Sequence, residues 1–477
     1  MRLSPCLVVA GLSTSVHAFY PWELKIATGA SISSRQTGFR RFMPWSLIPE
    51  ESEEEETAPL TLDIKKFRRD YSIVESETPT LKNSAALDQD GKDFSYFSVV
   101  KVGSQQQEMW LALDTGSPSS WVFSSKCISD TCKSHHTFDS STSDTYYSNS
   151  STFSLGYGSG QIQGDLGQDT MSLADLDVTL SFGFATSATK AFNSYPIDGI
   201  LGLGRSYTNG WEIPSFMDKV AEKGLISSNL VGFSLSRAND NNKDGEVNFG
   251  TVDTTKYDGD ITYTTTNADT WTIPMDDAYV NGVPCNLIGK SAIIDTGTTY
   301  ILIPPSDAAT LFGLIPGSSQ SGENYMIPCD STATVEFEFS NVKYSIEPED
   351  YIGSETDGGC ISTIVGHQSS GPNTWLVGDV FLKNVYSVFD FDNGQIGFGT
   401  KASNSSSGNG TFTAPAVTAA GTIASAASTD AAAASAAENS ATSTATSGPV
   451  ATINSATRFS NGLALSLIMT FAAALIL

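Results

Sequence analysis

Leu111-Ala112-Leu113-Asp114-Thr115-Gly116-Ser117 is an apolar run that ends in a turn of small residues carrying one carboxylate. A strand that ends in this way holds its Asp at the border of a hydrophobic layer. The same arrangement returns in Ala292-Ile293-Ile294-Asp295-Thr296-Gly297-Thr298. One Asp-Thr-Gly would be a weak signal in a chain of 477 residues. Two copies, each closing an apolar run and each followed by a hydroxyl residue, predict a pair of matched carboxylate turns.

The chain also repeats itself after each turn. Two apolar residues and a glycine follow further along each half, in Ile200-Leu201-Gly202 and in Leu376-Val377-Gly378. This repetition indicates two lobes that arose by duplication. We predict that the glycine lets one strand pass close behind the loop that bears the Asp. A pseudo-two-fold axis would then bring Asp114 and Asp295 face to face.

Composition favours a β-rich protein. Aromatic residues make up 10% of the chain, and short β-branched and aromatic runs recur from about residue 93 to 400 between Gly, Asn, Asp and Ser turns. The best helix signal covers residues 213–224, where Pro214 and Gly224 frame a short amphipathic segment.

The net charge of −26 argues against nucleic acid as a partner, because few cations are available to neutralise phosphates. An acidic surface also suits an acidic environment, since its self-repulsion falls with pH.

Residues 93–400 resemble the pepsin-like aspartic protease family, of the secreted fungal type held by a glycosylphosphatidylinositol (GPI) anchor. The motifs that carry the resemblance occur in the family's order: the first Asp-Thr-Gly, Tyr157-Gly158-Ser159-Gly160, Asp198-Gly199-Ile200-Leu201-Gly202-Leu203, the second Asp-Thr-Gly, and Phe389-Asp390-Phe391-Asp392-Asn393-Gly394-Gln395-Ile396-Gly397-Phe398. The resemblance implies an all-β fold of two lobes, residues 70–265 and 266–400, with a central cleft. It implies an aspartic-type endopeptidase for polypeptide substrates in acid, acting as a monomer without a cofactor or a metal.

The expected chemistry needs Asp114 and Asp295 in contact in a partly dry site. Two like charges so close cannot both ionise cheaply, so one carboxyl keeps a proton where the other is a carboxylate. The carboxylate takes a proton from a water molecule, and the protonated carboxyl polarises the substrate carbonyl and stabilises the oxyanion. The pair therefore titrates as a unit.

The resemblance assigns supporting roles to the hydroxyl residues of the two turns. Ser117 and Thr298 are expected to donate hydrogen bonds to the outer carboxylate oxygens. Thr115 and Thr296 are expected to hold the two loops together. Pro118 stands where the family usually has a serine, which puts the shape of the adjacent loop in doubt but leaves the carboxylate chemistry intact.

A second set of residues is expected to shape the site. Gly116 and Gly297 keep the turns free of side chains. Tyr157 lies in a glycine-rich stretch between strand-like runs, which reads as a mobile hairpin flap that binds substrate together with Gly158 and Ser159. Trp121 lies where the family places an indole that hydrogen-bonds the flap tyrosine.

The cysteines suggest a disulfide framework. Cys6 leaves with the signal peptide, and the resemblance implies the pairs Cys127–Cys132 and Cys329–Cys360. Cys285 would be unpaired, either buried or paired in a way that the sequence does not disclose. The adjacent His135 and His136 have no helical ligand partner, so we predict surface residues rather than a metal site.

The N-terminal region reads as two segments that are removed. Residues 1–18 resemble a secretory signal peptide, with a short apolar core and a small residue, Ala18, at the cleavage site. Residues 19–69 are rich in charge blocks and end in the basic pair Arg68-Arg69, which predicts a propeptide cut after Arg69. The alternatives are a buried helix for the first segment and an uncleaved disordered extension for the second.

The C-terminal region predicts attachment to a surface. Residues 401–454 are rich in Ser, Thr and Ala and read as a glycosylated stalk. Residues 455–477 resemble a signal for GPI attachment at Asn454, the alternative being a tail-anchored transmembrane helix. Asn149, Asn404 and Asn409 head N-glycosylation sequons. The predicted destination is the cell surface through the secretory pathway, at the plasma membrane or cell wall.

Two other functions fit parts of this pattern. A catalytically inactive relative could bind peptides in the same cleft, but it would need a broken motif, and both aspartates are present. A cell-wall mannoprotein would suit the stalk and the anchor, but it has no reason to keep two carboxylate turns and a flap. The sequence therefore favours the endopeptidase.

Overall fold

The computed structural model describes residues 72–158, 160–205, 213–240, 242–266, 269–356 and 358–402. The predicted signal peptide, propeptide and anchor signal lie outside these residues, as does the predicted stalk from residue 403 onward; Lys401, the first residue assigned to the stalk, instead ends strand β27 (Gln395–Lys401). The described part consists mostly of β-strands arranged in five sheets, with few helices. This confirms the predicted all-β class.

The first lobe is an eight-stranded sheet that contains the first carboxylate turn. Its hydrogen-bonded order is β2-β3-β4-β9-β5-β8-β7-β6, and a further pairing of β3 with β7 folds the sheet back on itself. The bounds in this order are Asp88–Gln89, Tyr96–Val102, Gln107–Asp114, Gly199–Gly202, Trp121–Phe123, Leu176–Ala188, Gly160–Leu173 and Tyr147–Tyr157.

The second lobe holds the second carboxylate turn in a five-stranded sheet of order β13-β16-β25-β17-β24. These strands span Thr272–Met275, Lys290–Ile294, Thr374–Val377, Ile301–Leu302 and Ile364–Val365. Two four-stranded sheets complete the lobe, β15-β14-β20-β21 and β18-β19-β23-β22. Their strands span Val283–Pro284, Asp277–Val280, Val335–Phe339, Val342–Ile346, Ser319–Ser321, Asn324–Ile327, Gly359–Ser362 and Ile352–Thr356.

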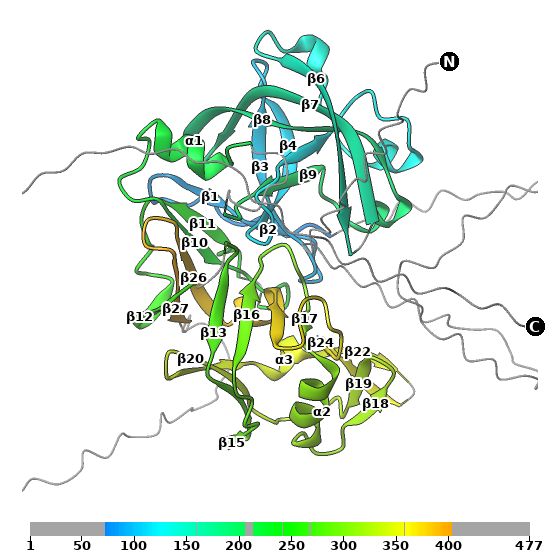
Figure 1. Ribbon diagram of the computed structural model, residues 1–477, viewed down its shortest axis with the longest axis vertical. Helices are drawn as coiled ribbons and strands as arrows, with labels where there is room; N and C mark the ends of the chain where they lie inside the picture. The colour runs from blue at the N-terminus through cyan, green and yellow to red at the C-terminus, as the bar shows by residue number, and fades with distance from the viewer. Residues whose placement is uncertain are drawn as a thin grey trace, which may run out of the picture. The chain divides into compact units, whose positions relative to one another are not determined.

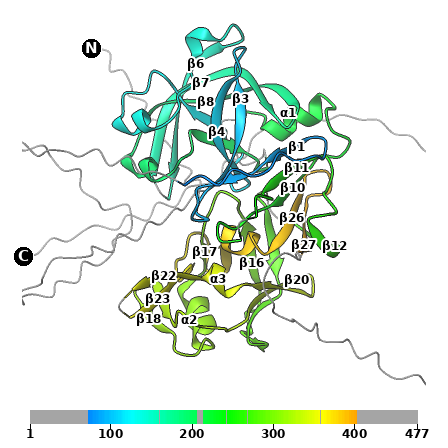
Figure 2. The same ribbon diagram turned by 180° about the vertical axis from the view of Figure 1, so that it is seen from behind.

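A six-stranded sheet joins the two lobes. Its order is β1-β11-β10-β26-β27-β12, and it combines strands from both ends of the described chain (Figure 1). These strands span Ser84–Ala86, Glu246–Phe249, Leu230–Ser234, Val385–Asp390, Gln395–Lys401 and Tyr257–Thr265. In both views the sheet lies between the long strands β6, β7 and β8 and the short strands around α2 (Figure 2). The two lobes, each of which carries one carboxylate turn, therefore share this six-stranded sheet.

The two lobes build their carboxylate turns in the same way. β4 pairs in parallel with β9, and β16 pairs in parallel with β25. A Cβ on Gly202 would lie 2.4 Å from the backbone of Pro118, and one on Gly378 would lie 1.9 Å from the carbonyl oxygen of Thr298. Only glycine fits so close an approach. The predicted passage of a strand behind each loop is present in both lobes.

Helices are short in the described residues. α1 spans Phe216–Glu222 within the predicted segment, and Ser215 caps it by accepting a hydrogen bond from the backbone N–H of Asp218. The helix is shorter than predicted because this cap fixes its start after Pro214. The others are α2, α3 and α4, at Pro305–Gly313, Pro348–Tyr351 and Asp379–Leu382, and three 3₁₀ helices, η2, η3 and η4, at Asp130–Ser134, Ser140–Thr142 and Lys190–Ser194.

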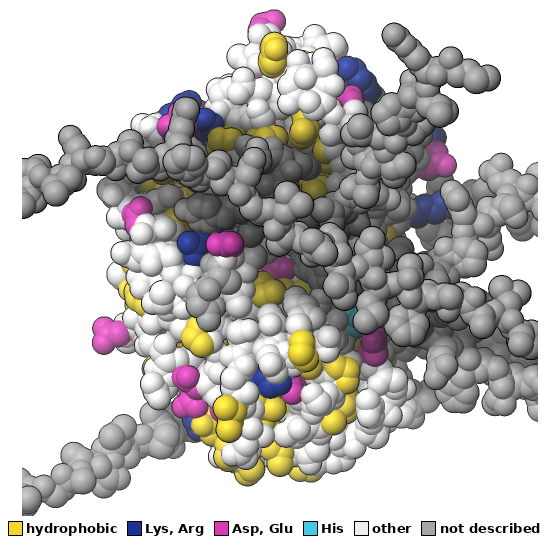
Figure 3. Space-filling view, in the orientation of Figure 1, with side chains coloured by type: hydrophobic (Ala, Val, Ile, Leu, Met, Phe, Trp, Pro, Cys, Tyr) yellow, Lys and Arg dark blue, Asp and Glu magenta, His cyan; other side chains and the backbone are white. Residues whose placement is uncertain are grey.

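The surface of the described residues shows where apolar side chains remain exposed. Hydrophobic side chains gather over the α2 and β15 end of the molecule, near the exposed Val283 and Ile288 (Figure 3). Lys and Arg side chains on this face lie singly or in small groups. None of the helices in the described ranges is long and apolar enough to cross a membrane.

Candidate active site

The two aspartates lie at corresponding strand ends. Asp114 is the last residue of β4, and Asp295 comes directly after β16. Both side chains are fully buried. Their strands pair with β9, which is buried throughout, and with β25, which is buried from Trp375 to Val377. The apolar run before Asp114 is buried, whereas Ile293 in the run before Asp295 is only partly buried. Each Asp thus lies at the end of a strand in a largely apolar sheet, where the chain leaves the sheet.

Four reciprocal hydrogen bonds lock the two turns together. The backbone N–H of Thr115 donates to Thr296 Oγ1 at 3.0 Å, and the N–H of Thr296 donates to Thr115 Oγ1 at 3.0 Å. The Thr115 hydroxyl donates to the carbonyl of Ile294, and the Thr296 hydroxyl donates to that of Leu113. Each threonine therefore satisfies the backbone of the opposite lobe, which fixes the distance between the two aspartates.

The two glycines leave room for the opposite carboxyl groups. A Cβ on Gly116 would lie 2.5 Å from the Asp295 carboxyl carbon, and a Cβ on Gly297 would lie 2.5 Å from Asp114 Oδ1. Real Cβ atoms do not approach other atoms so closely. Each lobe's carboxyl thus lies over the glycine of the other lobe's turn.

A single backbone donor touches both carboxyl groups. The N–H of Gly116 lies 2.8 Å from Asp114 Oδ1 and 3.1 Å from Asp295 Oδ1. Asp295 also accepts from the N–H of Gly297 at 2.8 Å and from the Thr298 hydroxyl at 2.7 Å. The two acids are therefore neighbours in one hydrogen-bond network, and Asp295 has more donors.

These surroundings separate the proton affinities of the two acids. Burial raises the pKa of Asp114 well above its usual range, and the charge of Asp295 raises it further. Burial also raises the pKa of Asp295, but the donors on Thr298 and Gly297 oppose this because they stabilise the carboxylate. The shared proton consequently favours Asp114.

Ser117 does not occupy the position predicted for its hydroxyl. Its Oγ accepts a hydrogen bond from the N–H of Ser119 at 3.2 Å, and its backbone N–H faces the Asp114 carboxyl instead. Asp114 Oδ2 has no hydrogen-bond partner within the described residues. The Ser117 oxygen thus acts as an acceptor for the backbone two residues further on, as short hydroxyl side chains commonly do. Thr298, by contrast, makes the predicted bond.

The flap residues lie where a hairpin would cover the dyad. β6 ends at Tyr157 and β7 begins at Gly160, so Gly158 and Ser159 form the connection; Ser159 lies outside the described residues. The Trp121 indole N–H donates to the Tyr157 hydroxyl oxygen at 2.8 Å. Burial, and then the Asp114 charge, raise the pKa of Tyr157 well above its usual range. The hydroxyl of Tyr157 therefore keeps its proton, and the negative charge of Asp114 favours this neutral form.

An aromatic cluster supports this pair. The Phe192 ring on η4 lies edge-on to Trp121 and Tyr157, with ring centroids 5.6 and 6.1 Å apart. Sequence reasoning missed Phe192, because a single aromatic residue in a polar stretch gives no periodic signal.

Asp379 is a third buried acid, close to the second turn, and the sequence analysis did not single it out. Its backbone N–H donates to the carbonyl of Thr298 at 2.8 Å. Burial raises its pKa well above the usual range; Lys383 opposes this, and the charge of Asp295 adds to it. Burial therefore favours the neutral form of this carboxyl. Its position after the glycine of the Leu376-Val377-Gly378 repeat was the available signal.

The cysteines and the glycosylation sites can be placed in part. The structure contains the disulfides Cys127–Cys132 and Cys329–Cys360. Cys285 is a buried free thiol, and burial raises its pKa to about 12. Asn149 is exposed on β6. Asn404, Asn409 and Asn454 lie outside the described residues.

The histidine pair differs from the prediction for one of its members. The side chain of His135 is only 2% exposed and packs on the Phe123 ring, with centroids 4.7 Å apart. Burial lowers its pKa, and the Asp198 carboxylate partly opposes this. His136 is exposed, as predicted, and its Nδ1 lies 2.9 Å from Asp198. The fold turns His135 inward because Asp198 fastens this segment to the neighbouring strand β4 through the Trp110 N–H.

Comparison with known proteins agrees with this geometry. A family model described as eukaryotic aspartyl protease matches residues 95–401. An aspartic-type endopeptidase, ctsD, from Aspergillus fumigatus is 47% identical over 416 residues, which are 84% of this chain and 88% of that protein. A probable aspartic-type endopeptidase, CTSD, from Arthroderma benhamiae is 39% identical over 398 residues, 81% of this chain and 77% of that protein. Cathepsin D from Dictyostelium discoideum is 34% identical over 324 residues, 65% and 84% respectively.

Proposed function

The chain belongs to the eukaryotic aspartyl protease family and is an aspartic-type endopeptidase, and on this premise we propose that it cleaves peptide bonds in acid with water activated between Asp114 and Asp295. The observation that carries the proposal is the Gly116 N–H, which contacts both carboxyl groups at 2.8 and 3.1 Å. Two acids so close share one proton between them. Both are supplied by the same chain, which supports action as a monomer.

The asymmetry of the dyad assigns the two roles. Asp295, stabilised as a carboxylate by Thr298 and Gly297, takes a proton from water, whose oxygen attacks the substrate carbonyl carbon. Asp114 gives its proton to the carbonyl oxygen. The proton on Asp295 then passes to the amide nitrogen, the carbon–nitrogen bond breaks, and one hydroxyl of the tetrahedral intermediate returns its proton to Asp114. The reaction ends with the carboxyl and amine products and needs no covalent intermediate.

Acid dependence follows from the proton that the pair must hold. Because burial raises the pKa of both acids, the pair keeps its proton at pH values where an exposed carboxyl is ionised. Activity should fall as pH rises and this proton is lost. The raised values place that loss well above the ordinary 3.8 of an Asp.

Cleavage of a mixed peptide library by the full-length secreted protein, from pH 3 to pH 7, tests the mechanism. We expect activity that is highest in acid and is blocked by a statine-type analogue, whose hydroxyl mimics the attacked carbonyl carbon. A folded protein that cleaves nothing, or whose cleavage the analogue leaves unchanged, would overturn the proposal.

We further propose that the protein is made as a zymogen with residues 19–69 as its propeptide. The support is the basic pair Arg68-Arg69, which lies shortly before the first described residue, Ser72. N-terminal sequencing of the secreted Asp114→Asn variant tests this, because that variant cannot process itself. A start at Asp70 supports cleavage by a separate protease, whereas a start at Phe19 contradicts removal of the segment.

The proposed location is the cell surface, held by a GPI anchor at Asn454 after a glycosylated stalk. The support is the apolar C-terminal run together with the Ser/Thr/Ala-rich stretch before it. Treatment of intact cells with a phosphatidylinositol-specific phospholipase C should release the enzyme. Retention on the treated cells, or an intact apolar tail in the purified protein by mass spectrometry, would contradict it.

N-glycosylation at Asn149, Asn404 and Asn409 is proposed from the three sequons. Asn149 is exposed on β6 and so is open to the transferase. Mass spectrometry of peptides after glycosidase treatment in heavy-oxygen water should show Asp with heavy oxygen at each position. An unmodified Asn at a position would remove that site.

A further inference from the structure

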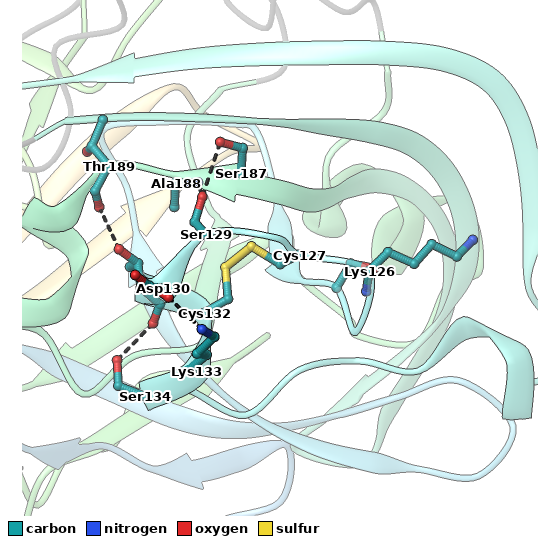
Figure 4. Close-up of a disulfide and its surroundings, with 12 residues drawn as sticks. Lys126, Cys127, Ser129, Asp130, Cys132, Lys133, Ser134, Ser187, Ala188 and Thr189 are labelled. Carbon is teal, nitrogen blue, oxygen red and sulfur yellow. Dashed lines mark hydrogen bonds and ion pairs between the residues drawn. A yellow bond between two sulfur atoms is a disulfide. The ribbon is translucent and has the colours of Figure 1, made fainter. Parts of the chain in front are cut away.

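The loop closed by Cys127–Cys132, here called the disulfide loop, is fastened to the end of β8. The Ile128 N–H donates to the carbonyl of Thr186 at 3.0 Å, and the Ala188 N–H donates to Ser129 Oγ at 3.1 Å. The hydroxyls of Ser129 and Ser187 lie 3.3 Å apart. Figure 4 shows the Ser129 side chain pointing toward Ser187, with the Cys127–Cys132 disulfide beside it. The loop thus follows one edge of the segment 186–189.

The last fastening of the disulfide loop is Thr131. Its side chain is buried, and its hydroxyl donates to the carbonyl of Thr189 at 3.3 Å. Ile128 is 86% exposed, whereas Cys132 is buried and, together with the partly buried Cys127, packs in the hydrophobic cluster that contains Trp121 and Phe192. The disulfide, this packing and these hydrogen bonds hold the loop in place.

The opposite edge of the segment 186–189 holds the flap. Thr189 donates its N–H to the carbonyl of Gln161 at 3.0 Å, and its hydroxyl accepts from the Gln161 N–H at 3.2 Å. Gln161 follows the first residue of β7, directly after the flap connection. Ile162 pairs with Ala188 next in line. Thr189 is consequently bonded to the disulfide loop on one side and to the base of the flap on the other.

Thr189 is also the N-cap residue of η4, whose Phe192 ring contacts the flap tyrosine, Tyr157. The N–H of Phe192 donates to the Thr189 carbonyl at 3.3 Å, the same oxygen that accepts the Thr131 hydroxyl. The Phe192 ring then contacts Trp121 and Tyr157. A displacement of Thr189 would therefore move both the base of the flap and the ring on which Tyr157 rests.

We infer that the disulfide loop positions the substrate-binding flap through Thr131 and Thr189. Thr131 is a positioning residue, since it reaches the substrate only through Thr189, Gln161 and Phe192. The inference rests on the proposed peptidase function, because it assigns a role in binding the same substrate. Contacts between flap and peptide are made in both the ground state and the transition state, so their loss raises KM more than it lowers kcat.

The test compares Thr131→Val with Thr363→Val in the full-length enzyme. Thr363 is a matched control, because its hydroxyl donates to the backbone carbonyl of Asp350 at 2.7 Å in the second lobe, away from the flap. We expect Thr131→Val to raise KM and the inhibition constant of a statine-type analogue about fivefold, as for one lost hydrogen bond, with kcat changed less than about twofold. Thr363→Val should leave all three within about twofold.

A second pair of variants strengthens the test. Removing the loop disulfide with Cys127→Ser and Cys132→Ser should raise KM by more than Thr131→Val does. Removing the other disulfide with Cys329→Ser and Cys360→Ser controls for general destabilisation. If a disulfide variant does not fold, the threonine pair alone decides.

Unchanged KM in Thr131→Val, an equal rise in Thr363→Val, or a loss confined to kcat would each overturn the inference. A wild-type protein that cleaves no peptide would instead overturn the proposed function, a result visible before any variant is compared.

Discussion

The two carboxylate turns share the tripeptide Asp-Thr-Gly but not the electrostatics of their acids. Asp295 receives the Thr298 hydroxyl at 2.7 Å and the Gly297 N–H at 2.8 Å. Asp114 receives the Gly116 N–H, while the Ser117 hydroxyl is engaged by Ser119. The pKa of Asp114 is accordingly raised further than that of Asp295. The proposed roles of Asp114 as acid and Asp295 as base rest on this difference between two copies of one motif.

The largest effect is expected from removing either acid. Asp295→Asn and Asp114→Asn should each lower kcat by about 10³-fold or more, because proton transfer at the dyad is lost. Asp295→Asn should be the more severe, since it removes the base, whereas the amide in Asp114→Asn can still donate a hydrogen bond to the substrate carbonyl. Single-turnover cleavage at the pH of highest activity measures both losses. A more severe loss in Asp114→Asn would reverse the assignment of roles.

The next effect tests a feature in which the turns are alike. Gly116→Ala and Gly297→Ala should each lower kcat/KM by about 100-fold, because the new Cβ would meet the opposite carboxyl and displace it. Gly313→Ala is the control, since a Cβ there meets nothing within 4 Å. Steady-state kinetics and circular dichroism on all three separate site damage from unfolding. Activity retained in only one of the two site variants would show that the carboxyls are not placed symmetrically.

A smaller effect tests the feature in which the turns differ. Thr298→Val should lower kcat/KM about tenfold in acid, because Asp295 loses a hydroxyl donor to its charged form. Its pKa then rises, so the acidic limb of the pH profile moves to higher pH. Ser117→Ala should change kcat/KM by less than about threefold, since its hydroxyl does not reach the Asp114 carboxyl. Equal shifts of the acidic limb in both variants would contradict the asymmetry.

The smallest effect concerns stability. The raised pKa of Asp114 means that the folded protein binds its proton more tightly than the unfolded chain does, so the stabilisation is complete below about 3.8 and is lost as pH rises through the folded value. The melting temperature should therefore fall by a few degrees between pH 4 and pH 8. Asp114→Asn should flatten this fall more than Asp295→Asn does. Calorimetry across that range would refute the ordering if Asp295→Asn flattened it more.

The fold class, the pair of aspartate turns and the two glycines behind them could be predicted from the order of residues in the chain. The reason is that these features are local: an apolar run ending at Asp-Thr-Gly specifies a buried strand with a carboxylate at its end, and the repeat of Gly202 and Gly378 specifies where a strand passes behind. The two copies of the pattern also predict that Asp114 and Asp295 lie close together, because duplicated lobes pack around a pseudo-two-fold axis. Chain order alone was sufficient for this part.

Only the folded structure shows how the surroundings of the two acids differ, where His135 points, and how Thr131 reaches the flap. Each depends on atoms that are distant in the chain: the Gly116 N–H donates to Asp295, the His136 N–H donates to Asp198, and the Thr131 hydroxyl donates to the carbonyl of Thr189. Hydrogen bonds and burial act over a few ångströms of space, whatever the separation in sequence. The positions of Asp114 and Asp295 could therefore be predicted from the sequence, whereas their pKa values depend on burial and on neighbours that only the folded chain brings close.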